Sequence, residues 1–223
     1  EPHITETALA YNFTNEGGIG GTFRFLKNIS GLWLLQESLR YWREHDGEDI
    51  SYAEAVARAK AARPFQCWVD PDAPDFNTPA SMPEAISRYC ANTGQVVPRT
   101  RDEVLRTVFE SLALKYRSVF DMLREMVGDI QVLHIVGGGS ANELLNQFTA
   151  NALGVQVVAG PVEATAIGNL MVQAMALGEV RSTAEIRTVV RDSFPVALFE
   201  PHDSADWEDA YGRWREVIAK SVA

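Results

Sequence analysis

The chain is predicted to be an α/β protein, and three patterns in its sequence support this fold class. An apolar segment with strand character, Val132–Val136, runs into three glycines and then into a pattern typical of a helix. Strand and helix patterns continue to alternate as far as Leu177, which favours parallel strand pairing within α/β layers. Ser/Thr-x-x-Glu sequences with capping-box spacing predict helix starts after Ser51, Ser81, Thr100, Ser140 and Ser182.

The strand candidates in chain order are Leu9–Thr14, Thr22–Leu26, Phe65–Val69, Val132–Val136 and Val155–Ala159. The first two flank a glycine-rich segment, residues 15–21, which predicts a hairpin. Residues 65–83 carry four of the ten prolines, so we expect a long ordered loop there.

The helix candidates are marked by apolar residues at helical spacing. The longest is predicted over Arg101–Val127, where apolar side chains recur on one face. Further helices are expected over Ile29–Arg43 and Asp206–Ala219.

The composition narrows the class of protein. The chain has 223 residues, a hydrophobic fraction of 46% and a formal net charge of −10. This acidic balance argues against a general nucleic-acid or anionic-membrane binder, whose affinity would rest on basic surface. No apolar run approaches the ~18 residues of a membrane span. Cys67 and Cys90 are the only cysteines, and we interpret them as reduced thiols in the cytoplasm, with a single bridge left open.

The three glycines, Gly137, Gly138 and Gly139, are the most informative residues of the chain. Glycine lets a ligand approach the backbone closely, and the following helix presents free N–H groups and the positive end of its dipole. This arrangement suits a nucleotide. The Lys-Ser/Thr of a Walker A loop and the Gly-x-Gly-x-x-Gly spacing are both missing, so a tight strand–helix turn is an equal alternative on these residues alone.

Three stretches together carry a resemblance: residues 12–36, with Leu26-Lys-Asn28 and Gly31-Leu-Trp-Leu-Leu-Gln36; residues 134–142; and residues 160–169. They resemble the C-terminal domain of the FGGY carbohydrate kinase family, and the first stretch resembles its rhamnulokinase branch. The resemblance covers nearly the whole chain, 1–223, and loosens after Gly178. It implies a three-layer actin-like, ribonuclease-H-like ATPase domain, one of two domains that hold nucleotide and sugar between them.

The resemblance also implies a function. Such kinases transfer the γ-phosphoryl group of Mg·ATP to a sugar hydroxyl, here O1 of L-rhamnulose. Gly138, with Gly137 and Gly139, would pack against the nucleotide; Asn142 would reach the adenine and Gln36 the nucleotide, while Asn28 would contact the sugar. From the residues alone, Asn142 could instead serve the local backbone, and Asn28 could be a helix N-cap. If the helix includes Asn28, its spacing from Gln36 would place both residues on one helix face.

The chain departs from the family's pattern at its beginning. The His-Asp-Thr or Gly-His-Asp stretch with the catalytic aspartate and the Ser-Gly-Thr phosphate contact are both missing. The chain begins with Glu1, and we expect that aspartate, two sheet strands and the sugar-binding N-terminal domain to lie upstream of it. The chain alone would then be inactive and would self-associate through an exposed sheet edge beside Leu9–Thr14.

The remaining polar residues give less information about function. Asp70, Asp72 and Asp75 lack the glycine and the terminal Glu of an EF-hand and are interpreted as a solvated turn. Glu163 is interpreted as a first-turn acid. No metal site is expected on the histidines. The alternatives in function are another FGGY ketose or polyol kinase, and a non-catalytic actin-like assembly module.

Overall fold

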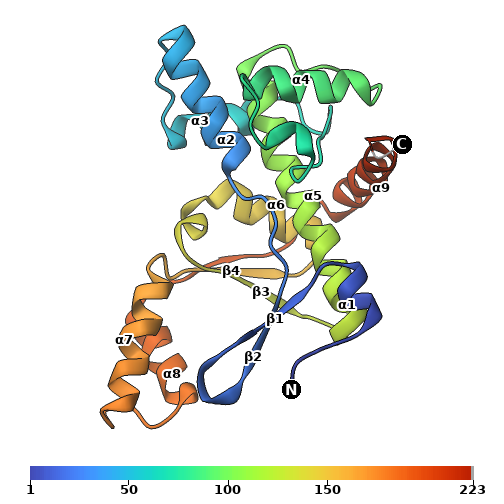
Figure 1. Cartoon of the computed structure of the whole chain (residues 1–223). Coiled ribbons are helices and arrows are strands. Elements are labelled where there is room, and N and C mark those ends of the chain that lie inside the picture. Colours follow the sequence, from blue (N-terminus) through green and yellow to red (C-terminus); the bar gives the residue numbers. More distant parts are fainter. Residues whose placement is uncertain (222–223) are drawn as a thin grey trace. The chain divides into compact units, whose positions relative to one another are not determined.

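The computed structural model describes residues 1–221 and shows a mixed α/β chain in two compact units (Figure 1). The first unit comprises residues 1–129 and the segment that begins at Glu208, and the second comprises Ile130–Trp207. The second unit is therefore inserted into the sequence of the first. None of the helices among the described residues combines the length and the apolar character that a membrane crossing requires.

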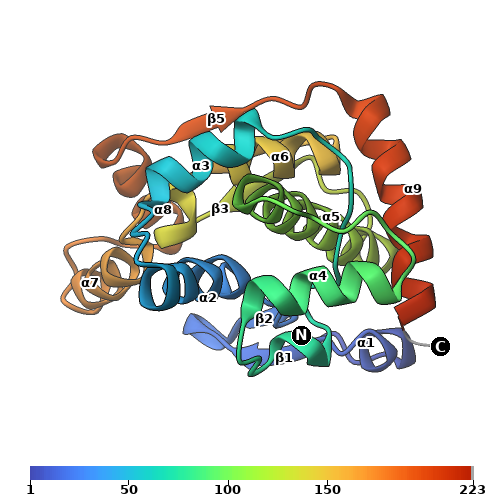
Figure 2. The ribbon, with the colours of Figure 1, turned by 90° about the horizontal axis from the view of Figure 1, so that it is seen from above.

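The first unit is built around the long helix α5 (Arg101–Val127), which has the predicted bounds. The helices α2 (Trp33–Tyr41), α3 (Tyr52–Ala61) and α4 (Met82–Asn92) contact α5 (Figure 2). The first half of α5 is largely buried among them, so this apolar face forms the core of the unit. The last helix, α9 (Ser204–Ser221), is anchored to this unit by Trp214, whose Nε1 donates to the Val69 carbonyl at 2.9 Å.

Four of the five predicted helix caps are confirmed. The side chains of Ser51, Ser81, Thr100 and Ser182 each accept from the backbone N–H three residues on. At Thr100 the box is complete, since the Glu103 side chain also returns to the cap backbone. The helix that follows the N-cap Ser182 is α8 (Thr183–Ser193).

The predicted hairpin forms, but its first strand is displaced along the sequence. Strands β1 (Thr14–Gly17) and β2 (Phe23–Leu26) pair antiparallel around the short 3-10 turn Ile19–Gly21. The strand expected over Leu9–Thr14 is wrong, because Thr5 caps a short helix, α1 (Glu6–Ala10), by accepting from the Ala8 N–H. The side-chain cap and an alanine-rich turn outweigh the strand character of this segment.

The strand expected over Phe65–Val69 is also wrong, although the segment lies in the predicted long ordered loop. The backbone N–H groups of Phe65, Trp68 and Val69 are bound by side chains of other segments rather than by a strand. The Phe65 N–H donates to the Glu110 carboxylate, and the Val69 N–H donates to Ser111 Oγ at 2.9 Å. Apolar, buried sequence was therefore mistaken for sheet.

The predicted helix Ile29–Arg43 is shorter at its start and differs at its end. It begins at Trp33 and passes at Trp42 into a π-helical turn, Trp42–Asp46. Residues 27–31, which include Asn28, have no regular secondary structure.

The second unit contains the predicted parallel strand pair. Strands β3 (Val132–Ile135) and β4 (Gln156–Ala159) are parallel, and β5 (Ala197–Phe199), which was not predicted, pairs antiparallel with β4. Helix α6 (Glu143–Leu153) connects β3 to β4 and packs on β4 and β5.

Helix α7 (Ala164–Ala176) is apolar in sequence, yet it has no buried residue. Leu170 is 66% exposed, and Leu177 just beyond the helix is 81% exposed. Large apolar side chains normally lie inside, so this surface is unusual for a soluble domain by itself.

Candidate functional site

The glycine loop joins β3 to α6 in the second unit and leaves open space beside its backbone. Gly137 has φ 78°, a left-handed conformation that favours glycine, and a 3-10 turn over Gly138–Ala141 follows it. A Cβ built on Gly137, Gly138 or Gly139 would meet no atom of the described chain within 4 Å. Packing within this unit therefore does not require a glycine at position 138.

Hydrogen bonds within the glycine loop and to neighbouring segments fix its backbone. The Gly137 N–H donates to the Pro161 carbonyl at 3.2 Å. Ser140 Oγ donates to the Gly137 carbonyl at 2.7 Å, and Nδ2 of the fully buried Asn146 donates to the Ser140 carbonyl at 2.9 Å. The loop is thus fixed to α6 and to the segment after β4.

Asn142, and not Ser140, is the N-cap of α6. Its Oδ1 accepts from the Leu145 N–H at 3.0 Å, whereas the Ser140 hydroxyl turns back to Gly137. The capping box predicted at Ser140 is therefore wrong, because the 3-10 turn delays the helix by two residues. The local role foreseen for Asn142 is confirmed, and within residues 1–221 its Nδ2 makes no hydrogen bond.

The amide N–H groups of Gly138 and Gly139 donate to no atom of the described part of the chain. Two free donors beside an open space, at the start of a helix, can bind an anionic or polar ligand group. Glu163 is the exposed N-cap residue of α7 and makes no side-chain capping bond.

The other two predicted site residues belong to the first unit. Asn28 lies exposed in the irregular segment before α2, and Gln36 lies exposed on α2. Because α2 begins only at Trp33, the expectation that both residues share one helix face is wrong. The alternative role of Asn28 as N-cap is also wrong, since the N-cap of α2 is Leu32.

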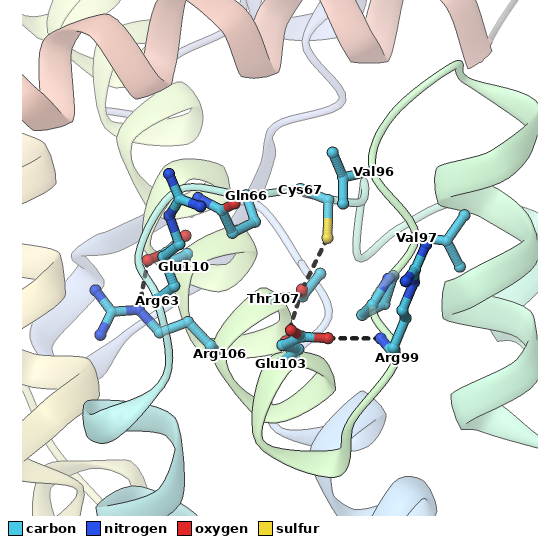
Figure 3. A pocket seen from close by; sticks show the side chains of 11 residues that line it. Arg63, Gln66, Cys67, Val96, Val97, Arg99, Glu103, Arg106, Thr107 and Glu110 are labelled. Carbon is cyan, nitrogen blue, oxygen red and sulfur yellow. Dashed lines mark hydrogen bonds and ion pairs between the residues drawn. The ribbon is translucent and has the colours of Figure 1, made fainter.

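A cavity of about 490 Å³ lies in the first unit and contains none of the predicted site residues (Figure 3). Its wall includes the buried Glu110, which pairs with Arg106 of the same helix face. Burial raises the pKa of the Glu110 carboxyl above its ordinary value, although Arg106 opposes this. Cys67 also reaches this wall, with Sγ 3.2 Å from Thr107 Oγ1, and both Cys67 and Cys90 are buried free thiols.

The aspartates of the long loop are ion-paired. Lys115 Nζ of α5 lies 2.9 Å from Asp70 Oδ1 and 2.8 Å from Asp72 Oδ2. Asp72 lies exposed in a turn and Asp75 is also exposed, as the interpretation expected, whereas Asp70 is half-buried and the ion pairs of Asp70 and Asp72 were not foreseen. Residues 1–221 hold no group of three or more His, Cys, Asp or Glu side chains arranged for a metal ion.

Comparison with known proteins decides the family. Residues 1–177 match the C-terminal domain of the FGGY family of carbohydrate kinases. The chain belongs to the FGGY family. The match ends where the resemblance in the sequence loosens.

Related sequences include proteins named rhamnulokinase. The chain is 48% identical to that of Bacteroides thetaiotaomicron over 97% of its own length and 44% of the relative's. It is 41% identical to that of Bacillus subtilis over 100% of its own length and 45% of the relative's. The chain thus spans less than half the length of these relatives.

Solved FGGY kinases share the fold. The ligand-bound xylulose kinase of Lactobacillus acidophilus superimposes with a TM-score of 0.70 at 15% identity, covering 100% of this chain and 44% of that one. The Plasmodium falciparum glycerol kinase with ADP gives 0.64 at 15% identity, covering 90% and 39%. The mixed α/β architecture is therefore that of the actin-like C-terminal domain in FGGY sugar kinases.

Sequence patterns indicated neither the hydrogen bond of Asn146 to the glycine loop nor the ion pair of Asp72 with Lys115. Asn146 carries a usable signal, because a buried helical asparagine requires a hydrogen-bond partner. The pairing of Lys115 with a loop 43 to 45 positions earlier in the sequence leaves no local pattern.

Proposed function

We propose that residues 1–223 form the nucleotide-binding C-terminal domain of an ATP-dependent kinase that phosphorylates O1 of L-rhamnulose, giving L-rhamnulose 1-phosphate. The identity of 48% to a rhamnulokinase over 97% of the chain carries this proposal. Whole-chain similarity at this level includes the stretch of residues 12–36, which is the part most specific to that branch.

The glycine loop would bind the nucleotide. The free N–H groups of Gly138 and Gly139 would donate to it, and the missing Cβ at Gly137, Gly138 and Gly139 would let it approach the backbone. Asn142 would contribute its Nδ2 to the adenine while its Oδ1 caps α6. Gln36 would add a second nucleotide contact and Asn28 a contact to the sugar.

The chain's own residues would position the reactants. Phosphoryl transfer needs alignment, charge neutralisation and a carboxylate that accepts the hydroxyl proton. We assign that carboxylate to no residue of the chain, because the family's aspartate-bearing stretch is missing from residues 1–223. Mg²⁺, when bound with ATP, would neutralise phosphate charge, and we assign none of its ligands to this chain.

ATP and free thiols at Cys67 and Cys90 are both consistent with a cytoplasmic protein.

A substrate panel tests the proposal. The complete protein that carries this chain is assayed with Mg·ATP and L-rhamnulose, L-xylulose, D-gluconate or glycerol, and the product is located by ³¹P and ¹H NMR. We expect the highest kcat/KM with L-rhamnulose and phosphate on O1. A higher kcat/KM with another ketose, acid or polyol would assign the chain to a different FGGY kinase.

The second candidate is a non-catalytic assembly module, which the exposed apolar surface of α7 favours. It predicts sugar-independent self-association of the complete protein and no turnover with any substrate of the panel. The same samples in light scattering distinguish the two.

A further inference from the structure

The segment that carries Asn28 has no regular secondary structure, so side-chain contacts must hold it in place. One of these contacts is to a carboxylate, and another joins Lys27 Nζ to the Tyr11 carbonyl at 2.6 Å. The Ser30 N–H donates to Asp72 Oδ1 at 2.7 Å, two residues beyond Asn28. A backbone amide bound to a charged acceptor is a short and strong type of hydrogen bond.

Asp72 is itself held by the core of the first unit. Its other oxygen, Oδ2, lies 2.8 Å from Nζ of Lys115, whose side chain is only 13% exposed. The same ammonium group binds Asp70, and the Asp72 N–H donates to Asp70 Oδ1 at 3.1 Å. Both aspartates thus lie at fixed positions relative to α5.

A second contact joins the same two segments. Trp33 Nε1, at the start of α2, donates to the Phe76 carbonyl at 2.9 Å, and Phe76 is buried. The long loop therefore holds the Asn28 segment both at Ser30 and at the beginning of α2. A path of direct contacts leads from Lys115 through Asp72 to Ser30, which follows Asn28 by two residues in the chain.

We propose that Asp72, held by Lys115, is a positioning residue for the sugar: it fixes the backbone beside Asn28 and thereby sets the affinity for the ketose. This inference rests on the proposed function, since it uses the sugar contact assigned to Asn28. It also gives the Asp-rich loop a role that its sequence pattern did not indicate. Asp75, exposed on the same loop, has no such contact in the described part of the chain.

The test uses four variants of the complete protein. Asp72→Ala removes the acceptor, Asp72→Asn keeps an acceptor oxygen without the charge, Asp75→Ala is the matched control, and Asn28→Ala removes the proposed sugar contact. Amide hydrogen exchange of residues 27–32 directly measures how firmly the segment that carries Asn28 is held. KM for L-rhamnulose, KM for ATP and the unfolding temperature are measured on the same samples.

We expect faster exchange and about a tenfold rise in the sugar KM for Asp72→Ala, with the KM for ATP unchanged. Asp72→Asn should recover most of both effects, and Asp75→Ala should match the parent. Unchanged exchange in Asp72→Ala, or equal changes in both KM values, would overturn the inference. If Asn28→Ala raises the sugar KM and Asp72→Ala does not, the inference fails while the proposed function stands. If neither variant changes it, the assignment of Asn28 fails as well.

Discussion

At the residue scale, a substitution at Gly138 distinguishes two roles for this glycine, one in forming the turn and one in binding the ligand. Its φ lies outside the left-handed region, and a Cβ there would meet no described atom within 4 Å, so Gly138→Val should fold. The branched side chain would occupy the space proposed for the nucleotide. We expect the affinity for ATP, measured by calorimetry, to fall at least about tenfold.

Gly212→Val is the matched control for this change. Gly212 lies exposed on α9 with equally open surroundings, so the same substitution there should leave ATP binding unaltered. Unchanged ATP affinity in Gly138→Val would mean that the glycine only serves the turn.

Asn146 tests whether the support of the loop matters for binding. Asn146→Leu leaves the Ser140 carbonyl without its donor, which should lower the free energy of unfolding by about 1–3 kcal/mol. The loop should also lose its fixed geometry, and the affinity for ATP should fall. Thr149→Val, which removes a buried hydrogen bond further along α6, should lower stability without changing ATP affinity. Equal ATP affinities in the two variants would refute the supporting role.

At the scale of elements, the contact between Lys115 of α5 and the long loop should make the free energy of unfolding depend on pH. Burial alone raises the pKa of the Asp72 carboxyl, but the hydrogen bonds from Lys115 and Ser30 outweigh burial and hold the pKa below its ordinary value. Burial alone lowers the pKa of Lys115, and the hydrogen bonds to Asp72 and Asp70 raise it above its ordinary value.

The lowered pKa of Asp72 and the raised pKa of Lys115 together predict a pH range over which their contribution to stability is constant. The contribution of Asp72 to stability is present above its unfolded pKa of about 3.9 and is lost as the pH falls through its lower native pKa. That of Lys115 is present below about 10.4 and is lost as the pH rises through its higher native pKa. Lys115→Met should therefore cost about 1.5–3 kcal/mol, constant between about pH 5 and 9 and smaller in acid. Urea unfolding across pH checks this, and a cost that grows in acid would contradict it.

Sequence patterns misjudged a segment that long-range side-chain contacts hold, and also turns whose contacts are local. The bounds of α5 were predictable, because a periodic apolar face and a complete capping box act locally. The segment Phe65–Val69 was misjudged because its amides bind Glu110 and Ser111, more than 40 positions away. Spacing alone equally favoured Ser140 as a cap, since only the three-dimensional turn shows that Asn142 is better placed.

At the scale of the whole molecule, we expect the purified chain of residues 1–223 to be inactive by itself. None of its residues is assigned as the base that accepts the sugar hydroxyl proton. A coupled assay with Mg·ATP and L-rhamnulose should show only background turnover. Robust turnover by this chain would place the base within residues 1–223.

We also expect the isolated chain to self-associate. The edge predicted beside Leu9–Thr14 is not available, because that segment begins as a helix, but β3 and β5 are outer strands and α7 exposes its apolar face. Light scattering should show oligomers that Leu170→Lys reduces. Val127→Lys, at the exposed end of α5, should not reduce them. A stable monomer of the unmodified chain would refute this expectation.

The insertion of the second unit between Asp129 and Glu208 has a consequence for biosynthesis. The N-terminal part of the first unit leaves the ribosome long before α9, whose Trp214 completes the packing around Val69. The intervening residues have their own sheet and can fold while that earlier part still waits for its last helix. A nascent chain should therefore complete the second unit before the first, and loss of α9 by premature termination should damage the part of the first unit that precedes the insertion.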